Sequence, residues 1–391
     1  MEKFKSFVEN HQKTAKDFLG FGIARIDLGS KKNVLCATYP VLNWKENFGS
    51  YAVFDVCKKF ATKISESESE EVYSITADFI SQCIDFFSPF IAEASIKPES
   101  HKNIQVLLHL KNILSKKDKN TDYRLVFLFQ DSQCASVETA YMKLLALSLG
   151  KAPLRSLNLD GIFGLLSNVA WSGNKPYELD YLRQNEIALK LDGEYPHIDF
   201  VDKFPRYLMQ VIPQYDNIRI LDTAKARFGA YLGKGGYTQM PGASYVNFNA
   251  GVEGACMNEG RIASSVVVGD GTDVGGGASI LGVLSGGNSD PISIGKNCLL
   301  GVNSSTGISL GDGCIVDGGI AVLAGTIFEV TPENAEKIKA INPDFEIKKE
   351  NLYKGRELAK LNGVHFRQDS RTGKMCAFRS NREITLNKDL H

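Results

Sequence analysis

Aliphatic side chains recur every six positions between residues 250 and 327. A helix requires apolar spacing near 3.6 and a half-buried strand requires alternation, so a period of six fits neither. It is typical of a parallel β-helix, in which each hexad forms one flat side of a triangular coil. Three sides give a coil of about eighteen residues, so this segment alone predicts about four coils. The repeated pairs are Val268-Gly269, Val274-Gly275, Ile294-Gly295, Leu300-Gly301 and Leu310-Gly311, and the phase continues through Val316 and Val322.

Small residues dominate the same segment. It holds 19 of the 36 glycines, no aromatic residue and one proline. We expect the aliphatic residue of each hexad to point inward and Gly, Asn or Asp to occupy the corners, because glycine reaches positive φ without steric cost. Cys298 and Cys314 follow such aliphatic positions by four residues, which predicts that both lie in the core.

The first 205 residues have the mixed pattern of an α/β domain. The run 125–129 (LVFLF) has the content of a buried strand. Helical spacing marks 104–114 and 136–149, and Gly150 is placed to end the second helix.

Turn-forming residues divide the rest of the chain. The coils begin irregularly over 218–249, with a loop expected at 233–242 and an excursion at 285–291 (SGGNSDP). The repeat ends before Thr331, an expected N-cap followed by a proline at the first helical position. A strand pair is expected around GVHFRQDS and KMCAFRS. The fold class is therefore an α/β N-terminal domain (1–205), a parallel β-helix (206–329) and a short α+β C-terminal segment (330–391).

Composition removes several classes of protein. The chain has 45 basic and 45 acidic residues, so no net charge favours nucleic acid or a membrane surface. The N-terminus lacks the apolar core of a signal peptide, and no apolar run is long enough to span a bilayer. Eight cysteines occur without a C-x-x-C pair, which argues against a zinc or redox motif. These features predict a cytoplasmic protein.

Hexapeptide repeats of this kind resemble the left-handed β-helices of acyl-CoA-dependent acyltransferases, which assemble as trimers with active sites between coils. Fold alone does not establish function, because solenoids also serve as scaffolds. Acetyltransferases of this fold usually use a coil histidine as the base, and its carbonic anhydrases need three histidines around a metal. None of the six histidines lies within 250–327. An acid–base or nucleophilic group there must be a carboxylate: Glu253, Glu259, Asp270, Asp273, Asp290, Asp312 or Asp317.

A more specific resemblance is carried by M-N-E-G-R-I (257–262), followed by V-x-x-G-x-G-x-x-x-G-G-G-A-S-I (266–280). With RSLNLDGIFGLLSNVAW (155–171) and GVHFRQDSRTG (363–373), it resembles the tetrahydrodipicolinate N-succinyltransferase family, in the longer form with a large N-terminal domain. The resemblance implies that Glu259 is the catalytic carboxylate, as an acyl-anhydride nucleophile or as a general base. It implies that Arg261 contacts the acyl donor, where its fork suits the distal carboxylate of a succinyl group. A solvated corner glutamate and an ion pair between coils are the structural alternatives.

The resemblance extends to the rest of the donor site. The implied donor-binding residues along the coil are Gly276, Ser279, Val302, Asp317, Gly318 and Gly325. Only Arg261 and Lys296 are basic within 250–327, so the phosphates of coenzyme A require the basic tail. The implied contacts there are Lys354, Arg367, Gln368, Asp369 and Ser370. Val302 replaces an expected alanine, and Gln368 and Asp369 depart from a more basic family pattern; a solvated tail is the alternative.

The resemblance therefore implies a homotrimeric enzyme that transfers succinyl from succinyl-CoA to tetrahydrodipicolinate in diaminopimelate and lysine synthesis. The acceptor is a small dicarboxylate, for which Arg219 and Arg227 are candidate partners. No metal is implied, because 223–245 has no Asp or Glu before the V-N-F-N element. An acetyl-CoA-dependent enzyme on the same acceptor and a non-catalytic scaffold are the competing hypotheses.

Overall fold

The computed structural model describes residues 1–114, 121–282 and 290–386. The chain divides into two compact units, one of Met1–Ala146 with Leu157–Pro205 and the other of Leu147–Ser156 with Arg206–His391. Most of the expected excursion at 285–291 lies outside the described residues. Within the described residues, no helix is long and apolar enough to cross a membrane.

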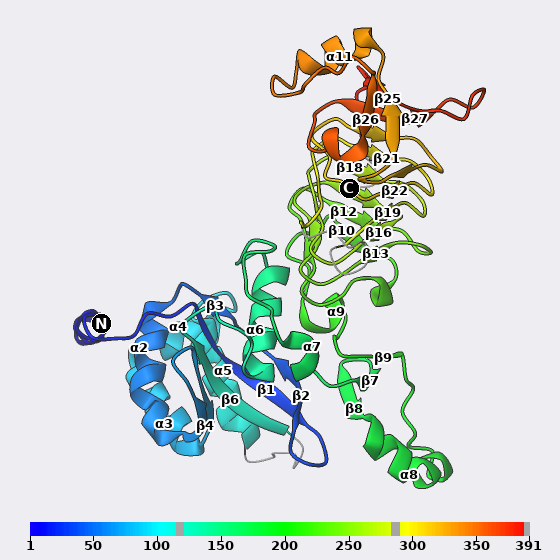
Figure 1. The fold of residues 1–391 in the computed structure, drawn as a ribbon. Helices are drawn as coiled ribbons and strands as arrows, with labels where there is room; N and C mark the ends of the chain where they lie inside the picture. Colours follow the sequence, from blue (N-terminus) through cyan, green and yellow to red (C-terminus); the bar gives the residue numbers. More distant parts are fainter. Residues whose placement is uncertain (115–120, 283–289, 387–391) are drawn as a thin grey trace. The chain divides into compact units, whose positions relative to one another are not determined.

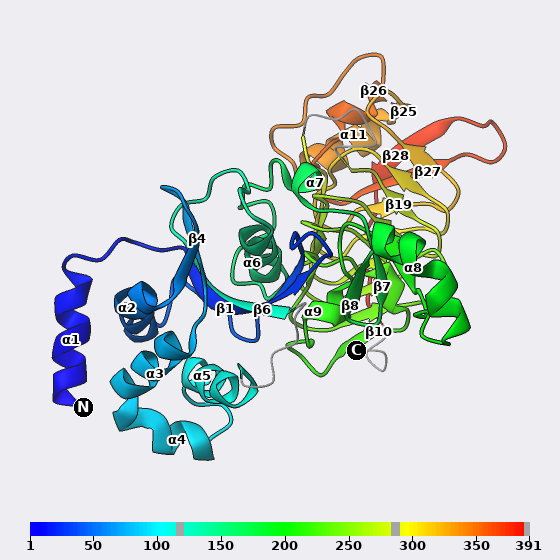
Figure 2. The same cartoon turned by 90° about the horizontal axis from the view of Figure 1, so that it is seen from below.

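The first unit is built on an antiparallel sheet with strand order β2-β1-β6-β5-β4, and β3 pairs with β1. Alternate residues of its central strands, such as Phe21 and Phe127, enter a core formed with α2, α3 and α5. Helix α6 covers the other face, where Glu138 pairs with Arg124 (Figures 1 and 2). The strands are β1 (Gly20–Leu28), β2 (Val34–Thr38), β3 (Asn43–Trp44), β4 (Thr62–Glu66), β5 (Glu70–Ser74) and β6 (Thr121–Leu128).

The helices of this unit agree with the apolar spacing of the sequence. Helices α5 and α6 correspond to the expected 104–114 and 136–149. Ser136 Oγ accepts the backbone N–H of Thr139 at the start of α6, and Gly150 follows its end with φ +66°. The helices are α1 (Glu2–Gln12), α2 (Phe48–Cys57), α3 (Ala77–Phe86), α4 (Ile91–Ile96), α5 (Lys102–Ile113) and α6 (Val137–Ser148).

A three-stranded antiparallel sheet, β8-β7-β9, completes the first unit. Trp171 of β7 is fully buried, and its indole N–H donates to the carbonyl of Asp202. The elements of this part are α7 (Ile162–Leu165), β7 (Val169–Ser172), β8 (Lys175–Glu178), α8 (Leu179–Leu191) and β9 (Phe200–Asp202).

The second unit is a parallel β-helix with three faces (Figure 1). The first face consists of β10 (Ile218–Ile220), β12 (Tyr237–Gln239), β15 (Cys256–Asn258), β18 (Thr272–Val274), β21 (Leu299–Leu300) and β23 (Ile315–Val316). The second consists of β13 (Tyr245–Val246), β16 (Arg261–Ile262), β19 (Ser279–Ile280), β22 (Ser305–Thr306) and β24 (Ala321–Val322). The third consists of β11 (Tyr231–Leu232), β14 (Gly251–Val252), β17 (Val267–Val268) and β20 (Ser293–Ile294). The short helix α9 (Tyr207–Gln210) precedes the coils.

The hexad aliphatics point into the coil, as predicted: Val268, Val274, Leu300, Val316 and Val322 are fully buried. Cys298 and Cys314 are fully buried as well. Burying one such side chain contributes roughly 1.5–3 kcal/mol, so the stack of aliphatics stabilises the coil along its length.

The coils are not uniformly eighteen residues long, contrary to the prediction. Leu300 pairs with Val316, a spacing of 16, whereas Ile262 pairs with Ile280, a spacing of 18. A spacing of 16 arises where one corner is two residues shorter than the others. For example, the inward residues Asn258 and Ile262, on adjacent faces, are four positions apart instead of six. The loop expected at 233–242 is also wrong in its centre, because Tyr237–Gln239 is a buried rung of the first face. Its polar Thr238 and Gln239 hide the apolar pattern.

The chain end closes the coil. Strand β27 (Val364–Gln368) pairs in parallel with β23, and β28 (Met375–Arg379) pairs with β27 to give the expected antiparallel strand pair. Helix α11 (Pro332–Lys339) begins as predicted, with Thr331 accepting the N–H of Asn334. Strands β25 (Ile327–Glu329) and β26 (Leu352–Lys354) complete this end.

Candidate active site

One corner position is repeated in four successive coils, between the first and second faces. The four residues are Glu259, Gly275, Gly301 and Asp317, and we call them the corner column. The backbone N–H of each donates to the neighbouring coil, to the carbonyls of Val274, Leu300, Val316 and Phe366 at 2.7–3.0 Å. Adjacent strands lie about 4.8 Å apart, so the column and the following rung, at Arg367, span about 19 Å.

A buried polar network shapes the corner at Glu259. Asn258 is fully buried inside the coil; its side-chain oxygen accepts the N–H of Gly260 at 3.0 Å, and its Nδ2 donates to Tyr237 Oη at 3.1 Å. A Cβ on Gly260 would lie 2.3 Å from the carbonyl oxygen of Ala278, so only glycine fits there. The chain therefore turns within a short corner, with Glu259 half-buried on its outer side.

A second carboxylate lies near Glu259. Asp273, on β18, is in register with Met257 on the neighbouring strand β15. Burial, and then the negative charge of Glu259, raise the pKa of the Asp273 carboxyl above its ordinary value. The surroundings of Glu259 thus include an acidic neighbour that is poorly solvated.

Arg261 lies on the second face. Alternation along one strand would put Glu259 and Arg261 on the same side, but the two residues do not share a strand. Glu259 is a corner residue beyond the end of β15, while Arg261 begins β16 on another face. Alternation does not continue through a corner, so it cannot place the two side chains together. Arg261 is exposed, and its Nε donates to Ser279 Oγ at 3.0 Å, which joins two of the predicted donor-binding residues. Within the described residues, no carboxylate forms an ion pair with this guanidinium.

The glycines in and beside the corner column differ in whether packing within the chain requires glycine at their positions. A Cβ on Gly275 would lie 2.6 Å from the carbonyl oxygen of Leu300, so the coil itself requires glycine there. At Gly276 the nearest described atom would be a methyl carbon of Val302, at 3.8 Å, and at Gly325 no described atom would lie within 4 Å. Gly318 is closer to the same valine, at 3.1 Å. Packing within the chain explains Gly275 but not Gly276 or Gly325.

At the far end of the column, Asp317 holds two groups of β27. His365 Nε2 and Arg367 Nε both lie 2.6 Å from its carboxylate oxygens. Burial opposes ionisation of Asp317, but these hydrogen bonds and charges hold its pKa below its ordinary value. The structure therefore brings Asp317 and Arg367 together, as an ion pair between adjacent rungs.

His365 is a residue that sequence reasoning missed. The six-residue repeat ends before it, so the coil was expected to contain no histidine. Because β27 pairs with β23, His365 stands in register with Ile315 and is buried against the last coil. The alternation in Val364-His365-Phe366 was the available signal for a strand, but not for which strand it would join.

Three of the other tail residues, Gln368, Asp369 and Ser370, lie where β27 ends and turns toward β28. Gln368 Nε2 donates to the carbonyl of Gly373, and Asp369 pairs with Arg371. Ser370 lies in the same exposed turn, and exposed Lys354 ends β26. The Asp369–Arg371 pair partly neutralises the basic tail, although exposed ion pairs contribute only about 0–1 kcal/mol and exchange readily.

The two candidate residues for binding the acceptor lie in the early coils. Arg219 lies on β10, and Arg227 donates to Asn247 at 3.1 Å. Among the described residues, no group of three or more His, Cys, Asp or Glu side chains is arranged to hold a metal ion.

Comparison with known proteins identifies the family. Family models for the N-terminal and middle parts of tetrahydrodipicolinate N-succinyltransferase match residues 2–164 and 166–206, and a hexapeptide-repeat model of succinyl-transferases matches 291–324. A 2,3,4,5-tetrahydropyridine-2,6-dicarboxylate N-succinyltransferase from Helicobacter pylori is 62% identical over the whole of both chains. The chain belongs to the tetrahydrodipicolinate N-succinyltransferase family.

Other members of this family agree over the full length. The protein of the same name from Nitratiruptor is 54% identical, over 100% of this chain and 99% of its own. A crystal structure from Campylobacter jejuni, described as a putative 2,3,4,5-tetrahydropyridine-2-carboxylate N-succinyltransferase, has a TM-score of 0.88 and 51% identity over 96% of each chain. The membership therefore covers the N-terminal unit as well as the coil.

Proposed function

We propose that this chain transfers the succinyl group of succinyl-CoA to tetrahydrodipicolinate, as the cyclic imine or its opened amino-oxo form. The cyclic imine opens by taking up one water, and the products are N-succinyl-2-amino-6-oxopimelate and free CoA, in diaminopimelate and lysine biosynthesis. The relatives carry the name of this reaction. The observation that carries the proposal is the corner column, with the carboxylate of Glu259 at one end and the basic β27–β28 hairpin beyond the other.

The proposed donor lies along this column. Its thioester is at Glu259, and the distal carboxylate of the succinyl group binds Arg261, whose fork suits a carboxylate. Ser279 supports this, because its hydrogen bond to Nε orients the guanidinium and leaves the terminal nitrogens for the donor. The pantetheine arm passes Gly276, Val302, Gly318 and Gly325, then Asp317. Lys354, Arg367, Gln368, Asp369 and Ser370 form the nucleotide end.

Two routes are chemically balanced at Glu259. As a base, Glu259 takes the proton of the attacking amine while the C–N bond forms and the C–S bond breaks, and the CoA thiolate leaves. As a nucleophile, its carboxylate displaces the thiolate and forms an acyl-anhydride, which the amine then attacks to release the carboxylate. Both require the same residue in the same place.

We further propose a cytoplasmic homotrimer with each active site between two subunits. A half-buried Glu259 on the outer side of a coil is open to a neighbouring subunit, which would exclude water from the reacting carbonyl. The free cysteines, seven of them buried, are consistent with a reducing compartment.

The function is tested by thiol release with tetrahydrodipicolinate and with succinyl-, acetyl- or glutaryl-CoA. We expect acceptor-dependent release that is fastest with succinyl-CoA. Equal or faster release with acetyl-CoA would instead establish the acetyl-transferring alternative, and no release with any donor would favour a scaffold.

Rapid mixing with succinyl-CoA alone separates the two routes. An anhydride releases about one CoA per active site before any acceptor is added, whereas a general base releases none.

A further inference from the structure

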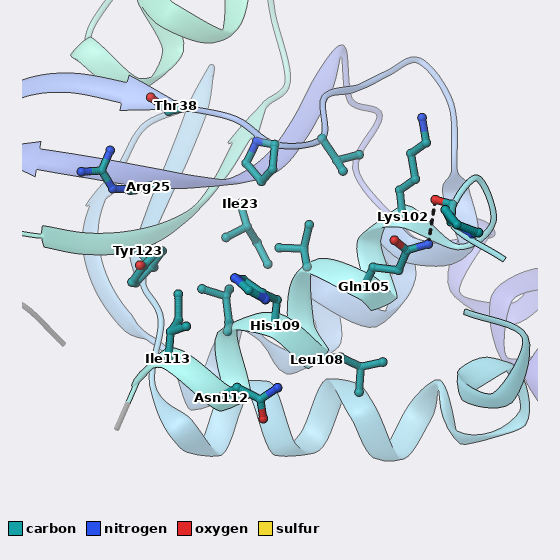
Figure 3. A pocket seen from close by; sticks show the side chains of 15 residues that line it. Ile23, Arg25, Thr38, Lys102, Gln105, Leu108, His109, Asn112, Ile113 and Tyr123 are labelled. Atoms are coloured by element: carbon teal, nitrogen blue, oxygen red, sulfur yellow. Dashed lines mark hydrogen bonds between the residues drawn. The ribbon is translucent and has the colours of Figure 1, made fainter. Parts of the chain in front are cut away.

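A cavity of about 980 Å³ opens in the N-terminal unit, between helix α5 and strands β1, β2 and β6. Its lining residues all lie within 23–123, and none belongs to the β-helix. Figure 3 shows Arg25 and Tyr123 at one end, Lys102 and Gln105 at the other, and His109 between them. The volume is at the upper end of the range of small-molecule sites.

One row of α5 faces this cavity. Lys102, Val106, His109 and Ile113 recur at the i, i+4, i+7, i+11 spacing of a single helix face, and all four line the cavity. Ile104 and Leu107, beside this row, are buried in the core, and buried Leu110 belongs to both the core and the cavity wall. Rows with this spacing ordinarily pack against protein. Here the row brings exposed Lys102 and His109 to the cavity, beside half-buried Val106 and Ile113, which also pack against the core.

The wall is held in place by hydrogen bonds. Gln105 Nε2 donates to the carbonyl oxygens of Ser100 at 2.6 Å and Pro98 at 3.0 Å, which fixes the loop before α5 against the helix. Ile23 of β1 is buried beneath the cavity as part of the core. The cavity is therefore built from regular elements and a pinned loop.

The charge of the lining has one sign. Among the described residues that line the cavity, Arg25, Lys102 and His109 can be cationic, and none is Asp or Glu. Arg25 is held in bidentate fashion by Asp27, at 2.6 and 3.1 Å, so its positive charge is largely neutralised. Lys102 supplies a cation, and His109 supplies an N–H donor in either protonation state.

We propose that this cavity binds a small organic carboxylate with an apolar body. His109 donates an N–H hydrogen bond to the carboxylate and Lys102 attracts it by its charge, and the apolar body packs on Ile23, Val106 and Ile113. The site lies outside the residues proposed for acyl transfer, so it stands or falls separately from that function.

The test uses the full chain and 4-phenylbutyrate as the probe, with the neutral 4-phenylbutyramide beside it in calorimetric titrations. We expect saturable binding of the acid at one site per chain, and we expect the amide to bind at least about tenfold more weakly. Lys102→Ala and His109→Ala should each weaken binding of the acid by about fivefold or more. Lys111→Ala is the matched control, because Lys111 is exposed on the same helix and does not line the cavity.

A filling variant, Val106→Trp, keeps the charges but occupies the space. It should abolish binding of the acid while the thermal midpoint stays within about 3 °C. The proposal is overturned by equal affinity for acid and amide, by a loss in Lys111→Ala equal to that in Lys102→Ala, or by the absence of saturable binding.

Discussion

Asn258 Nδ2 lies 3.1 Å from Tyr237 Oη, inside the coil and directly behind the corner that carries Glu259. The same amide accepts the N–H of Gly260 at 3.0 Å, so one side chain joins the core to the corner that carries Glu259. Asn258 is therefore a positioning residue for Glu259.

Asn258→Ala should lower both stability and turnover. It leaves the N–H of Gly260 and the hydroxyl of Tyr237 without this partner, which costs about 1–3 kcal/mol, and it frees the short corner. Tyr237→Phe is the comparison, because it removes the hydroxyl but keeps the bond to Gly260. We expect similar losses of thermal midpoint but a kcat at least about tenfold lower in Asn258→Ala. Equal kcat in the two variants would reduce Asn258 to a structural role.

Glu259→Gln should abolish turnover without unfolding the protein. The amide has nearly the shape of the carboxylate but is neither a base nor an effective nucleophile. Steady-state thiol release should fall by about 10³-fold or more, with the thermal midpoint unchanged within about 2 °C. Activity retained within about threefold would remove Glu259 from the chemistry.

Arg261→Ala should affect succinyl-CoA more than acetyl-CoA, because only the succinyl group has a distal carboxylate. We expect kcat/KM to fall by about 100-fold for succinyl-CoA and by less than about threefold for acetyl-CoA. Ser279→Ala, which removes only the hydrogen bond to Nε, should have a smaller effect of the same kind. An equal loss for both donors would contradict the proposed contact.

Gly275 and Gly276 are adjacent but should respond differently to alanine. Gly275→Ala forces a Cβ against the Leu300 carbonyl, so it should destabilise the coil by about 2 kcal/mol or more. Gly276→Ala meets no such obstacle within the chain and should change stability by less than about 0.5 kcal/mol. If the donor passes Gly276, that variant should raise the KM for succinyl-CoA. Unfolding curves and donor titrations on both variants separate packing from binding.

Asp273 and Asp317 predict opposite effects of pH on stability. The folded pKa of Asp317 is lowered, so its contribution is present at neutral pH and is lost as pH falls through that pKa. Asp317→Asn should therefore lower the thermal midpoint at pH 7, and this loss should shrink as the pH falls below about 4 and vanish once the pH is below the folded pKa. The folded pKa of Asp273 is raised, so its ionisation opposes folding at neutral pH. Asp273→Asn should raise the midpoint at pH 7 by about 2 °C, and this gain should vanish below about pH 4. Thermal unfolding across pH checks both signs, and a parallel response of the two variants would contradict them.

The sequence was sufficient for the architecture wherever one position recurs. Inward aliphatics such as Val274 and Leu300 define the coil because every turn repeats the same packing demand. The period failed at Tyr237–Gln239, where buried polar residues replace aliphatics, and at the short corner after Asn258. It also could not show that β27 joins β23, because that pairing depends on the path of the chain between residues 330 and 363.

The site residues were harder to place from the sequence. Glu259 and Arg261 came from a family resemblance, and strand alternation gave the wrong reason for setting them side by side. The ion pair of Asp317 with Arg367 joins residues 50 positions apart, which no local pattern reveals. The network of Asn258 and Tyr237 carried no sequence signal, since a polar residue at an inward position looks like a defect in the repeat.

The corner column has one residue in each coil, so its residues are spaced at a fixed interval. Each turn advances the chain by about 4.8 Å, so the separation of Glu259 from Arg367 takes only whole-number multiples of that step. Inserting or deleting one complete turn would leave the local geometry of both ends unchanged, yet would shift one relative to the other by about 5 Å. If the donor lies along the column as proposed, the length of donor that fits is set by the number of coils.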